Sequence, residues 1–377
     1  MKVVFTGGGS GGHFYPIIAV AEEINTIIAE RKLLDPKLFY IGPEPYDSRA
    51  LYENNIEFKQ SPAGKMRRYF SLLNVTDLLK TITGILGSIW QLYQIYPDVI
   101  FSKGGYASFP TLVAARLLRI PVIIHESDAV PGRVTKWSAQ FAKKIAVSYP
   151  ETATFFDEKK TALTGQPVRH SLYVVAKEGG KEFLDLDNTL PTLFIVGGSL
   201  GSQRINDTIL DALPKLVNTY QIIHQTGEHN FEEVQRTASF ILRENPHQNR
   251  YHVFDFLNPL ALRMAAGAAT LIISRAGSGL IFEIAMWGVP SIMIPIPEDI
   301  SHDQTKNAFS YARSGAAIVV EEKNLTPNLL LSEINRLIGD TSLLNQMGAA
   351  AKKFSKPKAA RSIAEAIITI GLSHEFK

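Results

Sequence analysis

The chain has 377 residues and a formal net charge of +3, from 39 Lys and Arg against 36 Asp and Glu. This length is typical of two or three domains. A composition of 45% hydrophobic and 20% charged residues is that of an ordinary globular protein and excludes disordered and collagen-like chains. Because there is no cysteine, disulfide frameworks, thiolate zinc sites and cysteine nucleophiles are excluded. The small excess of positive charge does not indicate a nucleic-acid partner.

The amino-terminal residues predict a strand rather than a secretion signal. Val3–Thr6 runs directly into glycines, whereas a signal peptide needs a longer apolar segment and a small-residue cleavage site. The sequence also lacks an uninterrupted run of about 18 apolar residues, the length that a membrane-spanning helix needs. Residues 81–97 come nearest, but Thr, Gly, Ser and Gln recur in them. We therefore expect a cytosolic protein.

Short apolar runs alternate with longer segments of helical pattern along most of the chain. Such alternation predicts βαβ units, and runs that are apolar at nearly every position predict strands buried on both faces of parallel sheets. The fold class is therefore predicted to be α/β. About six runs precede residue 165 and six follow residue 191: Val3–Thr6, Leu38–Ile41, Val99–Ser102, Pro121–His125, Lys144–Val147, Ala162–Thr164, Thr192–Val196, Gln221–Gln225, His252–Phe254, Leu271–Ser274, Ser291–Ile294 and Ala317–Val320.

Two doubly wound domains fit this pattern better than one large sheet, because each half opens in the same way. A strand runs into a glycine-rich loop and then into a helix, at Gly7–Gly12 in the first half and at Gly197–Gly201 in the second. We predict a first domain of residues 1–165 and a second of residues 166–356. The segment Gly165–Arg169 is the expected crossing between them.

The first glycine loop fits a phosphate-binding turn. Gly7, Gly9 and Gly12 satisfy G-x-G-x-x-G between a strand and a helix, where backbone amides and the helix N-terminus together favour phosphate or diphosphate. A nicotinamide dinucleotide would also need an acidic residue at the end of the second strand. That strand ends at Ile41, and Glu44 lies only in the loop beyond it. The alternative is that the glycines merely permit a tight turn.

Three further loops follow strands in the same way. Ser199, in the second glycine loop, could donate to a phosphate oxygen or cap the next helix. Lys103–Tyr106 is either another ligand-binding loop or a plain turn. Ser274–Gly279 precedes a helix that contains Glu283, whose carboxylate could accept hydrogen bonds from a ribose diol. A helical glutamate is otherwise a solvated surface residue.

Two histidines lie where such loops and strands end. His13 directly follows the first glycine loop, and its imidazole could act as a general base near neutral pH or have a purely structural role. His125–Asp128 ends a strand, which is where ligands usually bind in such sheets. No residue spacing typical of metal ligands occurs, so no metal site is expected.

A basic cluster precedes an apolar helical stripe. Lys65, Arg67 and Arg68 lie just upstream of apolar residues at helical spacing, namely Leu78, Leu79, Ile82, Ile85, Leu86, Ile89, Trp90 and Tyr93. A cationic cluster beside an apolar helix face with aromatic residues suits the surface of an anionic bilayer. The alternative is that this helix packs in the core.

Taken together and in this order, the motifs resemble the MurG-type glycosyltransferase family, the undecaprenyl-diphospho-muramoylpentapeptide N-acetylglucosaminyltransferases of peptidoglycan synthesis. The resemblance implies a GT-B fold, in which two Rossmann-like domains enclose a cleft and the last helix returns to the first domain with residues 357–377. It runs collinearly from residue 3 to about residue 313. Its motifs are residues 5–13, 103–106, 125–128, 165–169, 197–201, 274–278 with Glu283, and 303–307.

The resemblance also implies the reaction and its site. N-acetylglucosamine would pass with inversion from UDP-GlcNAc to the undecaprenyl-linked muramoylpentapeptide (lipid I to lipid II), without a metal or cofactor, at the cytoplasmic face of the plasma membrane. His13 is the expected general base. The expected acceptor-binding residues are Lys103, Gly104, Gly105, Tyr106 and Glu126. The expected donor-binding residues are Ser10, Gly11, Gly12, Asp128, Arg169, Ser199, Leu257, Ser278, Gly279, Leu280, Glu283 and Gln304.

By the same resemblance, the donor residues have distinct roles. Arg169 and Ser199 would contact phosphate, and Leu257 would line the uracil pocket. Glu283 would bind the ribose hydroxyls and Gln304 the sugar. The amides at the start of the helix that carries Glu283 would face the diphosphate.

The chain departs from the family pattern at four positions. Many relatives have Asn at Asp128 and Gln166, Thr at Leu280, and a basic or polar residue at Asp303. A carboxylate at Asp128 would repel a diphosphate unless it faces sugar hydroxyls. Because Leu280 has no hydroxyl group, backbone amides would have to replace the contact expected from Thr.

Three other functions remain open on the sequence alone. A galactolipid-synthase type of glycosyltransferase shares the fold and part of the motifs. An NAD-dependent oxidoreductase is favoured only by the G-x-G-x-x-G pattern. A non-catalytic sugar-nucleotide binding protein would fit if Asp128 and Leu280 mark lost activity.

Overall fold

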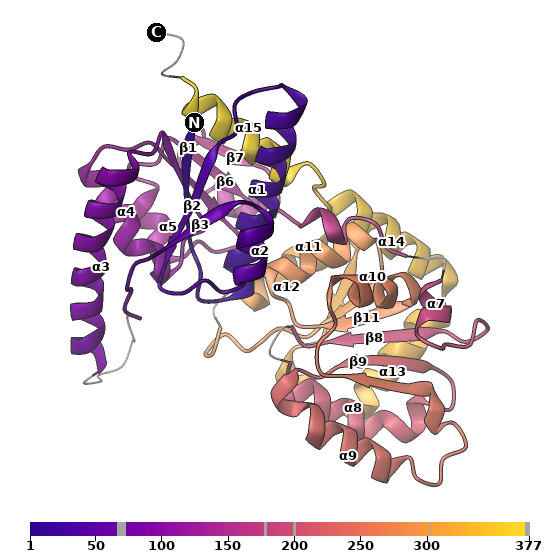
Figure 1. Ribbon diagram of the computed structural model, residues 1–377. Coiled ribbons are helices and arrows are strands. Elements are labelled where there is room, and N and C mark those ends of the chain that lie inside the picture. The colour runs from indigo at the N-terminus through magenta and orange to yellow at the C-terminus, as the bar shows by residue number, and fades with distance from the viewer. Residues whose placement is uncertain (66–72, 177–178, 199–200, 302, 374–377) are drawn as a thin grey trace. The chain divides into compact units, whose positions relative to one another are not determined.

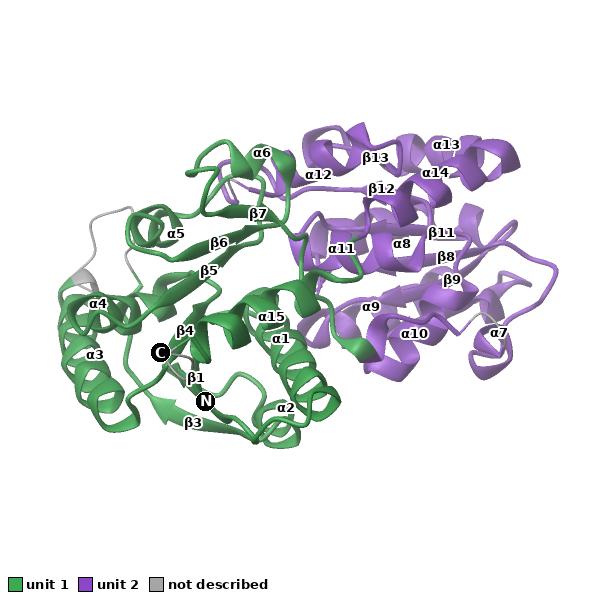
Figure 2. Ribbon diagram, turned by 90° about the horizontal axis from the view of Figure 1, so that it is seen from above, with its two compact units in different colours: residues 1–170, 356–377 green, residues 171–355 purple. Residues whose placement is uncertain are grey.

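The computed structural model describes residues 1–65, 73–176, 179–198, 201–301 and 303–373. The chain forms two compact units (Figure 2). Unit 1 consists of Met1–His170 with Lys356–Lys377, and unit 2 consists of Ser171–Ser355. The elements are labelled in Figure 1.

Unit 1 is built on a parallel sheet whose described strands lie in the order β3-β2-β1-β4-β5-β6-β7. Because the strands are parallel, their carboxyl ends share one edge of the sheet, where the loops after β1, β4 and β5 meet. The strands are β1 (Lys2–Thr6), β2 (Lys37–Gly42), β3 (Ile56–Gln60), β4 (Val99–Ser102), β5 (Val122–Glu126), β6 (Lys144–Val147) and β7 (Thr161–Leu163). The helices are α1 (Gly11–Glu30), α2 (Ser48–Glu53), α3 (Leu73–Ile95), α4 (Phe109–Leu117), α5 (Arg133–Ser138), α6 (Pro150–Ala153) and α15 (Ala359–Gly371).

Unit 2 has a second parallel sheet, in the order β10-β9-β8-β11-β12-β13 over the described residues. The strands are β8 (Thr192–Val196), β9 (Gln221–Gln225), β10 (Tyr251–Phe254), β11 (Leu271–Ser274), β12 (Ser291–Met293) and β13 (Ala317–Val319). The helices are α7 (Gly180–Phe183), α8 (Gln203–Leu216), α9 (Phe231–Ile241), α10 (Pro259–Ala268), α11 (Ser278–Trp287), α12 (Gln304–Arg313), α13 (Pro327–Ile338) and α14 (Thr341–Phe354).

The two sheets share one topology. In both, the third strand lies at an edge, followed by the second, the first, and then the fourth, fifth and sixth, and the sheet of unit 1 has β7 as a seventh strand beyond these. The prediction of two doubly wound parallel-sheet domains is confirmed, and the twelve predicted strands occur to within one residue at each end. The predicted cleft between the domains stays a prediction.

One strand of unit 1 was missed by the sequence analysis. Ile56–Gln60 forms β3 at the edge of the first sheet. Ile56 is buried, whereas Glu57 and Gln60 are exposed. A search for continuously apolar runs finds strands covered on both faces, so it does not find an edge strand that is partly solvated.

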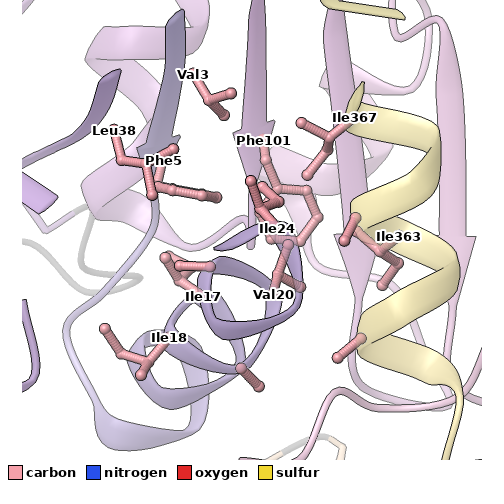
Figure 3. Packing of buried hydrophobic residues seen from close by; sticks show 14 of the residues in the cluster. Val3, Phe5, Ile17, Ile18, Val20, Ile24, Leu38, Phe101, Ile363 and Ile367 are labelled. Atoms are coloured by element: carbon pink, nitrogen blue, oxygen red, sulfur yellow. The ribbon is translucent and has the colours of Figure 1, made fainter. Parts of the chain in front are cut away.

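The core of unit 1 joins the two ends of the chain. Ile17, Val20 and Ile24 of α1 and Ile363 and Ile367 of α15 meet the side chains of β1 and β4 in one buried cluster (Figure 3). These five residues are no more than 2% exposed, and full burial of such a side chain is worth about 1.5–3 kcal/mol. The carboxyl-terminal helix therefore holds α1, and with α1 the glycine loop that precedes it.

The core of unit 2 is formed in the same way on its own sheet. Leu193 and Ile195 of β8 pack with Ile209 and Leu213 of α8 and Ile334 of α13, all fully buried. Burial of this apolar face fixes α8 against β8. The glycine loop between β8 and α8 is therefore anchored at both ends.

Helix α3 has its apolar side turned outward. It packs beside α4 in unit 1 (Figure 1). Near its middle the buried positions are small, Gly84 and Ser88, and Ser88 Oγ lies 2.8 Å from Ser61 Oγ. On the opposite side Leu86 and Trp90 are 63% and 61% exposed. In the described parts of the chain, no helix is both long and apolar enough to cross a membrane.

The packing of α3 predicts opposite effects for alanine at two of its glycines. A Cβ at Gly84 would lie 1.8 Å from the Pro62 carbonyl oxygen, whereas a Cβ at Gly87 would meet no atom within 4 Å. We expect Gly84→Ala to displace the helix and lower the free energy of unfolding by about 1–3 kcal/mol. Gly87→Ala, the matched control, should raise it by about 0.5–1 kcal/mol, because alanine favours helix. Urea unfolding of both variants measures the difference, and a change of the same sign in both would contradict the prediction.

Candidate functional site

The first glycine loop is held between two aromatic side chains. The Tyr40 hydroxyl donates to the Gly7 carbonyl oxygen. Gly9 has a φ of +90°, and a Cβ there would lie 2.8 Å from Tyr106 Cε1. Ser10 and Gly12 remain exposed beyond this contact. The loop is thus fixed on one side while its predicted ligand-binding positions stay open on the other.

His13 lies at the start of α1 beside two of the predicted site loops. Its Nδ1 is 3.0 Å from Ser10 Oγ, and a Cβ at Gly105 would lie 3.6 Å from the ring. Burial, and after it the Lys103 ammonium, lower the pKa of His13 to about 4. The imidazole is therefore neutral at pH 7 and carries a lone pair that can accept a proton.

The side chain of Lys103, a predicted contact of the acceptor substrate, is turned into the protein interior. It is 2% exposed, and its Nζ lies 2.6 Å from His125 Nδ1 and 3.3 Å from Gln166 Oε1, with a further contact to Ser127 Oγ. His125 Nε2 donates to the Gly165 carbonyl oxygen at 2.9 Å, so Nδ1 is left to accept. The three protons of the ammonium thus match three acceptors.

Charge in this cluster is balanced by Glu126. Burial lowers the pKa of Lys103 to about 8, although Glu126 and Asp128 act to raise it. Burial likewise raises the pKa of Glu126, whose oxygens accept from the backbone amides of Asp128 at 3.2 Å and Gly132 at 3.0 Å. Both side chains therefore stabilise the ends of β4 and β5 rather than presenting charge to solvent.

Other predicted residues of unit 1 form a turn after β4 or contact aromatic rings. Gly104 and Gly105 form a turn with φ of +73° and +78°, followed by half-buried Tyr106. Lys65 Nζ lies 5.4 Å from the centre of the Tyr106 ring. Arg169 lies over the ring of Tyr15 on α1.

The second glycine loop packs closely on the neighbouring strand end. Gly201 has a φ of +74°, and a Cβ there would lie 1.8 Å from the Thr226 carbonyl oxygen. A Cβ at Gly198, by contrast, would meet none of the described atoms within 4 Å. Ser199 lies outside the described residues, so its predicted phosphate contact stays a prediction.

The start of α11 is lined by glycines that are not covered by the described part of the chain. A Cβ at Gly277 or Gly279 would meet no atom of the described residues within 4 Å, and Gly277 caps the helix without a side-chain hydrogen bond. The first amides of a helix have no acceptor within the helix, so they favour an anion. Ser278 is buried, while Leu280 and Glu283 are half-buried on the following turn.

Two other predicted donor residues have defined partners in unit 2. The Leu257 amide donates to Gln225 Oε1 at 3.2 Å, and the Leu257 side chain is buried. Gln304, the first residue of α12, accepts from the Ile296 amide at 3.2 Å through Oε1. Its Nε2 group can therefore still donate to a ligand.

The structure brings together residues that the sequence analysis did not connect. Tyr15 and Tyr40 were not singled out, and their contacts with Arg169 and Gly7 associate them with the site. An aromatic residue in the first turn after a glycine loop is the one sequence signal that could have found Tyr15. Within the described residues, no group of three histidine or acidic side chains could hold a metal, and the expectation of a metal-free reaction stays a prediction.

Two family models match most of the chain. Residues 3–147 match the N-terminal domain of glycosyltransferase family 28, and residues 192–363 match its C-terminal domain. A UDP-N-acetylglucosamine–N-acetylmuramyl-(pentapeptide) pyrophosphoryl-undecaprenol N-acetylglucosamine transferase of Treponema denticola is 34% identical over 96% of each chain. A protein of the same name from Clostridium kluyveri is 36% identical over 93% of this chain and 95% of its own.

Solved structures agree with this relationship. MurG of Acinetobacter baumannii superposes with a TM-score of 0.73 and 26% identity, over 98% of this chain and 99% of its own. A UDP-GlcNAc 2-epimerase from Neisseria meningitidis reaches a TM-score of 0.70 over 98% of this chain and 100% of its own, but at 14% identity it supports the fold alone. The predicted GT-B fold class is confirmed. With both family 28 domains matched and relatives above 30% identity over nearly their full length, the chain belongs to the MurG family of glycosyltransferases.

Proposed function

We propose that the protein transfers N-acetylglucosamine from UDP-GlcNAc to undecaprenyl-diphospho-muramoylpentapeptide, with inversion at the anomeric carbon. The observation that carries this proposal is the match, over nearly the whole length of both chains, to relatives named for that transfer. The structure supports it with a glycine-lined turn before a helix in each unit, Ser10–Gly12 and Gly277–Gly279.

The donor is held mainly by backbone amides. The start of α11 accommodates the diphosphate, and the Leu280 amide replaces the threonine hydroxyl that the resemblance implies at this position. Glu283 binds the ribose diol, and Gln304 donates through Nε2 to the sugar. As the bond to UDP breaks, negative charge grows on the diphosphate, and each amide or guanidinium donor that faces this charge is worth about 2.7–4 kcal/mol. Asp128 fits this site only if it faces sugar hydroxyls.

His13 takes the proton from the attacking acceptor hydroxyl. When Nδ1–H donates to Ser10 Oγ, Nε2 is left as the acceptor beside Gly105. A pKa of about 4 keeps the ring neutral in the free protein. An incoming diphosphate anion raises that pKa, because a nearby negative charge favours imidazolium. The base therefore becomes stronger when the substrates are bound.

The acceptor lies over the turn Gly104–Tyr106. Lys103 and Glu126, turned inward, position this turn instead of touching the acceptor. The lipid of the acceptor stays in the bilayer, so the protein docks on the membrane through the outward apolar side of α3. Within the described residues this side is Val75, Leu78, Leu79, Ile82, Leu86, Trp90 and Tyr93, each at least 46% exposed.

The docking surface continues past α3. Ile85 is half-buried beside the apolar side. Lys65 lies over the ring of Tyr106. We expect Lys65 to bind anionic headgroups together with Arg67 and Arg68, which lie outside the described residues. We therefore propose that the protein acts at the inner face of the plasma membrane.

The proposed reaction predicts a defined product. Purified protein incubated with labelled UDP-GlcNAc and a short-chain lipid I analogue should yield the lipid-linked disaccharide and UDP. UDP-galactose with diacylglycerol, the substrates of a galactolipid-synthase type, should yield nothing. Binding of UDP-GlcNAc without UDP release in the presence of acceptor would show a sugar-nucleotide binding protein instead.

Loss of the His13 imidazole should slow the chemical step. We expect His13→Ala to lower kcat by about 10²- to 10⁴-fold, the usual contribution of a general base, while UDP binding stays near that of wild type. Between pH 5.5 and 7.5, kcat/KM should show no histidine titration, because the pKa of His13 in the free protein is about 4 and the base form persists above it. Near-normal turnover of His13→Ala with both substrates bound would assign the base to another residue.

The apolar side of α3 should control binding to vesicles. The double substitution Leu86→Ser with Trp90→Ser should reduce sedimentation with anionic vesicles, because two exposed apolar anchors are lost, without lowering the melting temperature. Charge reversal at Lys65, Arg67 and Arg68 should have the same effect, and the effect should weaken with salt. Phe240→Ser, at an exposed aromatic of α9 in unit 2, is the control. Unchanged sedimentation of the α3 variant would remove this surface from the proposal.

A further inference from the structure

Arg169 is a half-buried arginine that has no hydrogen-bond acceptor among the described residues. Within the described residues none of its N–H groups is paired and no carboxylate forms an ion pair with it. Its Nε is shielded from solvent in this unpaired state. Burial of an unpaired guanidinium N–H is costly, so the position favours a ligand that supplies an acceptor.

The guanidinium is held instead by the face of an aromatic ring. Arg169 Cζ lies 3.8 Å from the centre of the Tyr15 ring, well within the range of a cation–π contact. This contact orients the cation without using any of its N–H donors. All of its N–H groups can therefore still donate to a ligand.

Tyr15 is itself fixed from both ends. Its hydroxyl donates to Asp47 Oδ2 at 3.3 Å, and Asp47 Oδ1 accepts from the Ala50 amide as the N-cap of α2. On the other side, a Cβ at Gly11 would lie 3.3 Å from the Tyr15 ring. The ring thus connects Arg169 to the glycine loop at Ser10–Gly12.

A second arginine of the predicted site shows the opposite arrangement. Arg275, in the loop before α11, donates to the carbonyl oxygens of Ile294 and Pro295 and forms an ion pair with Glu322 at 2.5 Å. Its charge is neutralised inside unit 2, so it is not available to an anion. Of these two arginines, only Arg169 has a guanidinium whose charge is left to bind an anion.

We propose that Tyr15 is the positioning residue of Arg169: its ring, anchored through Asp47, holds the unpaired guanidinium ready for the diphosphate of the sugar nucleotide. This rests on the proposed function, in which Arg169 contacts the donor. Tyr15 acts through Arg169 and does not touch the substrate in this role. The ring preorganises the cation, which lowers the entropy lost when the diphosphate binds.

The test compares UDP with uridine by calorimetry on the full-length protein. Uridine lacks the phosphates, so the ratio of the two affinities isolates the diphosphate contribution. Tyr15→Leu removes the ring and should weaken UDP binding about three- to tenfold, the range of an aromatic–cation contact, without changing uridine binding. Tyr15→Phe keeps the ring and should retain most of the UDP affinity.

Arg169→Lys is a second variant that leaves the packing of α1 untouched. Lysine keeps the charge but cannot stack flat on the ring, so we expect a similar loss of UDP affinity. The double variant Tyr15→Leu/Arg169→Lys should then lose less than the sum of the two, because both remove the same contact.

The outcomes separate this inference from the proposed function. If Tyr15→Leu leaves UDP affinity unchanged while Arg169→Met lowers it, Arg169 contacts the donor without Tyr15 and the inference fails alone. If Tyr15→Leu weakens uridine and UDP equally, the ring has only a structural role and the inference also fails. If Arg169→Met leaves UDP affinity unchanged, the donor role of Arg169 in the proposed function fails as well.

Discussion

Backbone amides can face a ligand at a strand–helix turn only if the side chains of that turn do not cover them. In both units this condition is met by glycines packed against a neighbouring strand end. Gly9 contacts Tyr106, and Gly201 approaches the Thr226 carbonyl oxygen more closely than any side chain would allow. One side of each loop is thereby immobilised, and the other keeps its amides accessible. The proposed substrate contacts in both units depend on this packing.

Charged residues near these loops have two separate uses. Lys103 and Glu126 are buried, with hydrogen bonds to His125, Gln166 and backbone amides. Their charges stabilise the edge of the sheet, and Lys103 adds to the burial that lowers the pKa of His13. Arg169 differs, because it packs on an aromatic ring and has no hydrogen-bond acceptor in the described part of the chain. A charged side chain whose hydrogen bonds are already made within the protein stabilises the fold, whereas one that lacks such partners can bind a ligand.

The apolar residues of helix α3 are likewise divided between two roles. Its buried middle consists of small residues that let it approach Pro62 and Ser61, while large apolar side chains such as Leu86 and Trp90 face outward. A helix that served only the core would have the reverse arrangement. This exposed apolar side is the surface that we propose to dock on the bilayer.

The sequence by itself determined the strands, the doubly wound class and the glycine turns, because these follow from local apolar periodicity and from backbone freedom at glycine. It missed β3, whose alternation reflects an edge position that only the assembled sheet defines. It also grouped Lys103 with the acceptor residues, since no local pattern shows that the side chain turns inward to His125. The contact of Tyr15 with Arg169 joins residues far apart in the chain. Such pairings depend on how parallel strands bring their ends together, and tertiary packing alone decides them.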